Sequence, residues 1–87
     1  NRIEVEEASL LTKETKKYNV IVANILAHII ELMLEDAYKL LEDGGYFITS
    51  GIIKDKKDEL LEKMLEQGFK LVEETSDNEW YSFVATK

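Results

Sequence analysis

Asn24 is the residue with the clearest opportunity for chemistry in this sequence, because it directly follows the apolar run of residues 20–23. Three of those four residues are β-branched, and an unbroken run of this kind is typical of a strand buried on both faces, as in a parallel sheet. Ligands of open α/β sheets bind beyond the carboxyl ends of the strands. The Asn24 side chain is therefore a candidate for accepting hydrogen bonds from a ligand.

Asn24 also has a purely structural explanation. Asn is among the best residues for accepting a hydrogen bond from the first amides of a helix, and a helical pattern follows it closely. On its own, Asn24 is most simply interpreted as a helix cap. Only the surrounding elements can favour a catalytic role.

A long amphipathic helix follows Asn24. Its apolar residues recur with the spacing i, i+3, i+4, i+7 and are Leu26, Ile29, Ile30, Met33, Leu34, Ala37, Leu40 and Leu41. Gly44 and Gly45 are predicted to stop this helix, since glycine readily takes the left-handed conformation that closes helices. Residues 46–50 then form a second buried strand, which makes a βαβ unit with parallel strands.

The rest of the sequence predicts a second helix and an antiparallel hairpin. The helix covers residues 54–67 and ends at Gly68, and the hairpin strands cover 69–74 and 79–86 with a polar connection at 75–78. We predict an α/β fold with a mixed, mostly parallel sheet in the strand order 18–23, 46–50, 79–86, 69–74. A short strand at residues 3–5 is predicted at an edge, displaced from the sheet or disordered.

Length and charge restrict the classes of function. The 87 residues form a single domain, and their net charge of −7 argues against binding to nucleic acid or to an anionic membrane. Without cysteine, and with one histidine, the chain offers no thiolate or multi-histidine metal site. No segment has the roughly 18 consecutive apolar residues that a membrane span needs, so we expect a cytoplasmic protein.

Other polar and aromatic residues receive structural interpretations. His28 lies beside the apolar stripe of the first helix and is expected to be a surface or partly buried residue. Lys54, Lys56 and Lys57 are interpreted as solvated surface. Trp80 is interpreted as a packing residue of its strand, since aromatic residues in strands are most often core.

The order of four motifs raises the odds of a catalytic role for Asn24. The motifs are Val22-Ala23-Asn24-Ile25-Leu26, Gly44-Gly45-Tyr46 through Ser50-Gly51-Ile52-Ile53, Gly68-Phe69 and Glu79-Trp80. In this order they resemble the C-terminal half of a class I S-adenosylmethionine-dependent methyltransferase domain. They are most similar to the methyltransferases that act on protein eleven of the large ribosomal subunit.

This resemblance implies a cofactor, a substrate and a set of site residues. Asn24 would lie beside the methyl group of S-adenosylmethionine, and the carbonyl of Ile25 would help it to aim an amino group of a ribosomal protein. Glu7, Ser9 and Leu10 would lie against the adenine of the cofactor. The glycine-rich turn and the acidic residue expected to bind the rest of the cofactor are absent, so residues 1–87 are interpreted as a partial domain, inactive alone.

Two other functions stay open on the sequence alone. An acidic, non-enzymatic module could form homo-oligomers through an exposed edge of the strand at residues 18–23. In the third interpretation, the chain is part of another nucleotide-binding fold with a similar arrangement of strands and helices.

Overall fold

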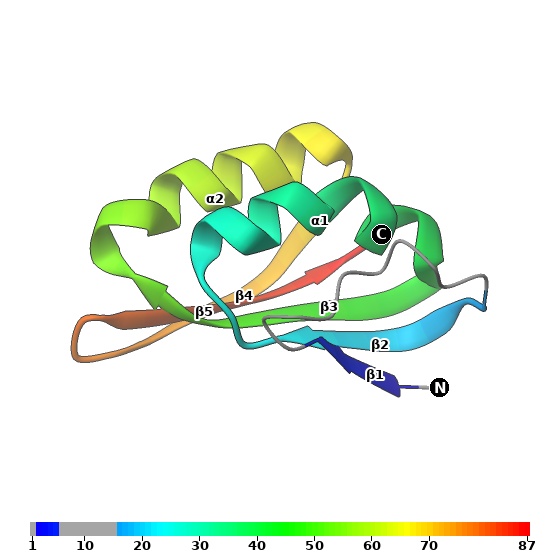
Figure 1. Ribbon diagram of the computed structural model, residues 1–87, viewed down its shortest axis with the longest axis horizontal. Helices are drawn as coiled ribbons and strands as arrows, with labels where there is room; N and C mark the ends of the chain where they lie inside the picture. Colours follow the sequence, from blue (N-terminus) through cyan, green and yellow to red (C-terminus); the bar gives the residue numbers. More distant parts are fainter. Residues whose placement is uncertain (1, 6–15) are drawn as a thin grey trace.

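The apolar patterns of the sequence build one five-stranded sheet, and both helices cover the same face of it (Figure 1). The computed structural model describes residues 2–5 and 16–87. In chain order the elements are β1 (Arg2–Val5), β2 (Tyr18–Ala23), α1 (Ala27–Leu40), β3 (Leu41–Ile53), α2 (Lys54–Gln67), β4 (Lys70–Asp77) and β5 (Trp80–Thr86). The strand order is β1-β2-β3-β5-β4, which confirms the predicted order of the last four strands.

Strand β1 corrects the prediction for residues 3–5. It pairs in parallel with β2, with Ile3 opposite Ile21, and is neither displaced from the sheet nor disordered. The Val5 side chain is 3% exposed, so the pairing buries an apolar residue and also satisfies backbone groups along one side of β2. The edge expected to be open at residues 18–23 is therefore covered, and β1 and β4 form the two edges of the described sheet.

The ends of α1 differ from the prediction at both termini. The N-cap is Leu26, with no side-chain cap hydrogen bond, so Asn24 is not the helix cap. The helix ends at Leu40, because Leu41 is already extended and its fully buried side chain enters the core. Gly44 does not end the helix. It has φ +79° and lies within β3, where the register with β2 shifts between the Tyr18–Leu41 pair and the Val20–Tyr46 pair.

Helix α2 has the predicted bounds, whereas β3 extends beyond the predicted residues 46–50 at both ends. Helix α2 ends at Gly68, where φ is +118° and the Phe69 amide donates to the Met64 carbonyl at 3.1 Å. Strand β4 continues to Asp77, so the hairpin connection is shorter than predicted. Its turn contains Asn78 with φ 60°, a left-handed conformation that Asn tolerates better than most residues.

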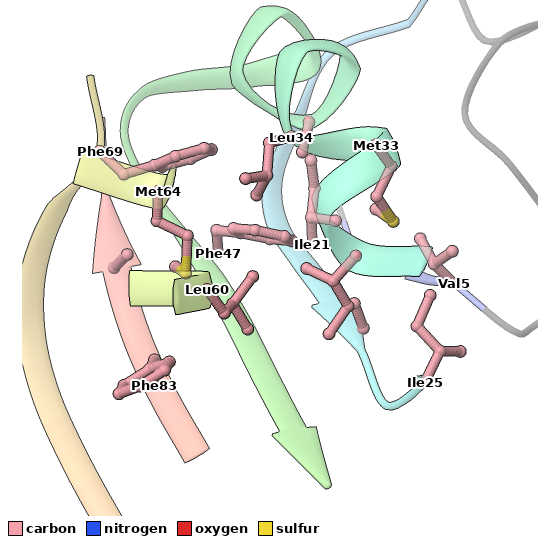
Figure 2. Close-up of a cluster of buried hydrophobic side chains, with 14 of the residues drawn as sticks. Val5, Ile21, Ile25, Met33, Leu34, Phe47, Leu60, Met64, Phe69 and Phe83 are labelled. Atoms are coloured by element: carbon pink, nitrogen blue, oxygen red, sulfur yellow. The ribbon is translucent and has the colours of Figure 1, made fainter. Parts of the chain in front are cut away.

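The core lies between the helices and the sheet. Figure 2 shows Phe47, from the middle of β3, among side chains of both helices and of the neighbouring strands. Phe47 stacks on Phe69 with ring centroids 5.1 Å apart, and Tyr38 of α1 meets Phe69 edge-on at 5.1 Å. The buried apolar faces predicted for the helices and the central strands thus meet in a single layer, which holds the strand ends in place.

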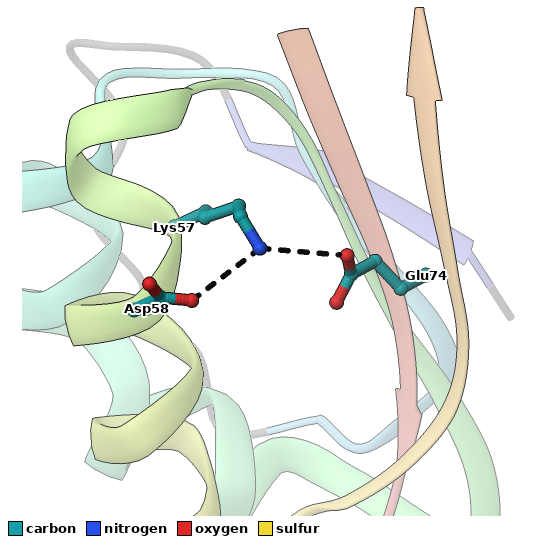
Figure 3. Close-up of polar contacts among 3 residues, drawn as sticks. All are labelled: Lys57, Asp58 and Glu74. Atoms are coloured by element: carbon teal, nitrogen blue, oxygen red, sulfur yellow. Dashed lines mark ion pairs between the residues drawn. The ribbon is translucent and has the colours of Figure 1, made fainter.

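Lys57 joins α2 to the hairpin and is not the solvated residue predicted, since its side chain is only 22% exposed. Its Nζ lies 3.4 Å from Asp58 and 3.7 Å from Glu74 on β4 (Figure 3). It also lies 4.8 Å from the ring centroid of Tyr81. A hydrogen bond to Asp58 and the nearby negative charges raise the pKa of Lys57 above 10.5. The lysine therefore stays charged in the folded protein at neutral pH.

Replacing Lys57 by Met is expected to lower the melting temperature at pH 7 by a few degrees, because β4 loses its charged contact with α2. Because the pKa of Lys57 is higher in the folded protein than in the unfolded chain, its charge stabilises the fold fully at pH values below 10.5, the unfolded pKa. This stabilisation is lost as the pH rises through the folded pKa. The deficit of the variant should therefore shrink above pH 10.5. Thermal unfolding followed by circular dichroism measures the loss of melting temperature, and Lys56→Met, at an exposed lysine, is the control. Equal melting temperatures for the two variants would show that Lys57 does not stabilise the packing of α2 on β4.

Candidate functional site

Asn24 lies at the carboxyl ends of two adjacent parallel strands. It directly follows Ala23, the last residue of β2, which pairs with Thr49 of β3. Its side chain is exposed and extends over β3, where its Oδ1 atom would lie 2.8 Å from a Cβ atom placed on Gly51. The carboxamide therefore lies at the edge of the sheet where ligands of α/β proteins bind.

Gly51 makes this arrangement fit. It has φ +74° and lies in the shift of register between the Thr49 and Ile52 pairings of β3 with β5. Bulges of this kind are frequent next to active sites, because they redirect a strand near its end. Any other residue at position 51 would have both a strained backbone and a side chain in the space that the Asn24 oxygen occupies.

The side chain of Ile25 anchors the turn between β2 and α1. It is 9% exposed and points into the core near Val5, as Figure 2 shows. The role predicted for Ile25 concerns its backbone carbonyl, and that role remains a prediction. Burial of Ile25 next to exposed Asn24 and Leu26 fixes which side chains of the turn face outward.

A hollow of about 140 Å³ adjoins Gly51, and its wall is largely apolar. It is lined by Leu26, Ala27, His28, Gly51, Ile53, Lys56 and Trp80. The Trp80 side chain is 54% exposed, so its interpretation as a packing residue is wrong, whereas Phe83 of the same strand is completely buried. His28 is exposed as predicted and also borders this hollow.

Sequence reasoning therefore missed the apolar wall formed by Leu26, Ile53 and Trp80. The positions of these residues gave a signal. Ile53 is the last residue of β3, and Trp80 is the first residue of antiparallel β5, so both lie with Asn24 where the parallel strands have their carboxyl ends. Exposed large apolar residues gathered at such an edge indicate a binding surface.

Other predicted site residues cannot be placed. Glu7, Ser9 and Leu10 lie outside the described residues. Within residues 2–5 and 16–87, no three acidic or histidine side chains are grouped as metal ligands would be. No helix in that part of the chain is long and apolar enough to cross a membrane.

Comparison with known proteins places the chain in a family. All of residues 1–87 match the sequence profile described as "Ribosomal protein L11 methyltransferase (PrmA)". The chain belongs to this family. A ribosomal protein L11 methyltransferase of Staphylococcus aureus strain JH1 is 51% identical over 85 residues, which are 98% of this chain and 27% of that protein. The chain thus spans about a quarter of the length of such relatives.

Solved structures share the fold of this chain. A ribosomal protein L11 methylase from Lactobacillus delbrueckii subsp. bulgaricus superposes with a TM-score of 0.87 at 26% identity, covering 94% of this chain and 42% of that one. A TehB-like SAM-dependent methyltransferase from Corynebacterium glutamicum gives a TM-score of 0.68 at 16% identity, covering 91% of this chain and 54% of that one. The predicted Rossmann-like methyltransferase fold is therefore confirmed.

Proposed function

We propose that this chain is the C-terminal part of the catalytic domain of a protein methyltransferase, which transfers methyl groups from S-adenosylmethionine to amino groups of ribosomal protein L11. Membership of the family supports the reaction. The observation that carries the proposal for the site is the position of the Asn24 carboxamide, between the carboxyl ends of β2 and β3 and over Gly51. A cytoplasmic location is part of the proposal.

Methyl transfer to an amine requires the nitrogen lone pair to point along one line at the methyl carbon. The Asn24 Oδ1 atom and the Ile25 carbonyl can each accept a hydrogen bond from an uncharged amino group, which orients that lone pair. Gly51 leaves room for the carboxamide, and the buried Ile25 side chain fixes the turn that carries it. The apolar side chains of Leu26, Ile53 and Trp80 line the adjoining hollow, and substrate bound on them would limit the access of water to the incoming nitrogen.

The part of the cofactor site that we propose for this chain is its acceptor side. S-adenosylmethionine supplies a methyl group bonded to a positively charged sulfur, which makes that carbon reactive towards a neutral amine. Asn24, Glu7, Ser9 and Leu10 are the residues of this chain that would hold it. Gly51 lies next to the Asn24 carboxamide and also lines the hollow of about 140 Å³.

The proposed methylation of L11 is tested with the full-length protein that contains this chain. With radiolabelled S-adenosylmethionine and purified ribosomal protein L11, the full-length protein should label L11 on amino groups, which mass spectrometry of its peptides would locate. The 87-residue chain should give no labelling. If the full-length protein binds the cofactor and L11 but transfers no methyl group, the proposed reaction is wrong.

The rate of methylation is expected to rise with pH. A protonated amine has no lone pair, so log kcat/KM should increase with a slope of about 1 below the pKa of the acceptor and level off above it. The break should lie near 7.7–8.0 for an N-terminal amine and near roughly 10.4 for a lysine. Rates from about pH 6 to about pH 11.5 with each acceptor cover both breaks. A rate independent of pH would show that deprotonation of the amine does not limit the reaction.

A further inference from the structure

A second hollow continues from the site towards the hairpin turn. It has a volume of about 310 Å³ and is lined by Ile53, Lys54, Asp55, Glu79 and Trp80. It shares Ile53 and Trp80 with the hollow beside Gly51, and these two residues are paired across β3 and β5. We call the two hollows together the acceptor trough.

The two ends of the acceptor trough differ in chemistry. At the Gly51 end its wall contains the exposed apolar side chains of Leu26 and Ile53, which are 54% and 43% exposed, together with His28 and Lys56. At the hairpin end it carries the carboxylates of Asp55 and Glu79 beside the half-exposed Trp80 indole. Lys54 is the one cationic residue that lines this end.

The two carboxylates are available to a partner. The ion pairs across residues 2–5 and 16–87 are made by other side chains, so neither Asp55 nor Glu79 forms an ion pair within the described part of the chain. Both residues are exposed. An aromatic face flanked by carboxylates is a favourable environment for an ammonium or guanidinium group, through cation–π attraction and charge-assisted hydrogen bonds.

We propose that the acceptor trough binds an extended segment of the substrate protein with a basic side chain close in sequence to the methylated amine. The amine lies at Asn24, the apolar part of the segment lies on Leu26 and Ile53, and the basic side chain lies on Trp80 near Asp55 and Glu79. This inference rests on the proposed function and adds to it a rule of substrate selection.

Glu79 is the residue with which to test the proposal. It lies in the hairpin turn, whereas Asp55 is in the first turn of α2 and also stabilises that helix electrostatically. In the full-length protein, Glu79→Lys is expected to raise the KM for ribosomal protein L11 by about tenfold, since a charge-assisted contact is lost and a repulsion is added. The kcat and the Kd for S-adenosylmethionine should not change.

Asp43→Lys is the matched control, since it makes the same charge change on an exposed residue. Asp43 lies near the start of β3, whereas the trough lies at Ile53, at the other end of that strand. It should leave the KM for L11 unchanged. Replacing the basic residues of L11 near the methylated amine by Glu, one at a time, should give one substrate variant that binds Glu79→Lys better than the original enzyme. That reciprocal rescue would establish the contact.

Three outcomes would overturn the proposal. An unchanged KM for Glu79→Lys, while Asn24→Ala lowers kcat by about 10²–10³-fold, would refute the basic-segment rule but leave the proposed function intact. A lowered KM for Glu79→Lys would mean that the trough meets an acidic segment. Absence of any methyl transfer to L11 by the unmodified full-length protein would refute both the proposed function and this inference.

Discussion

Replacing Asn24 by Ala in the full-length protein is expected to lower kcat for methylation of L11 by about 10²–10³-fold, the usual effect of removing a positioned hydrogen-bonding group from an active site. The loss should fall on kcat, because the carboxamide aims the nitrogen and contributes little to binding of the rest of the substrate. Stability should change little, since Asn24 is exposed and does not cap α1.

Gln67→Ala is the matched control for this variant. It removes a carboxamide at the end of α2, far along the helix from the strand ends that carry Asn24, and should leave kcat unchanged. Steady-state kinetics with L11 as the varied substrate separate kcat from KM. A kcat for Asn24→Ala within threefold of the original (about 0.6 kcal/mol) would remove Asn24 from the mechanism.

Replacing Gly51 by Ala should reduce both stability and activity. A residue with a Cβ atom at φ +74° is expected to cost about 1–2 kcal/mol of folding free energy. The new methyl group would lie 2.8 Å from the present position of the Asn24 Oδ1 atom, so the carboxamide must move. A displacement of about 1 Å at a positioning group can lower the rate about 10²-fold.

Gly44→Ala separates these two effects. Gly44 has a similar φ of +79°, but nothing lies within 4 Å of a Cβ atom placed there. Both variants should therefore lose similar stability in denaturant titrations, and only Gly51→Ala should lose activity. Equal kcat values for the two variants would contradict the view that Gly51 makes room for Asn24.

The elements of the fold follow from local patterns and were therefore predictable. The apolar spacing of α1, the buried runs of β2 and β3, and the closing hairpin each depend on residues close in sequence. Gly68 ends α2 as predicted, because it takes the left-handed conformation, with φ +118°, that closes the helix. At the end of α1, burial of Leu41 in the core determines the boundary instead, so the glycines at 44 and 45 were a misleading signal.

The site was only partly predictable, because part of it depends on the pairing of distant residues. Asn24 could be placed at a strand end from its neighbours in sequence. Its contact with Gly51 depends on the bulge between Thr49 and Ile52, and a bulge leaves no clear pattern in a sequence. Trp80 was assigned to the core from residue type alone, although the start of β5 lies at the open edge of the sheet.

The position of the acceptor nitrogen tests the central claim most directly. A crystal structure of the full-length protein with S-adenosylhomocysteine and L11 should place that nitrogen within about 3.2 Å of the Asn24 Oδ1 atom, at hydrogen-bonding distance. A nitrogen directed at the sulfur of the cofactor but out of reach of the Asn24 side chain would contradict the account.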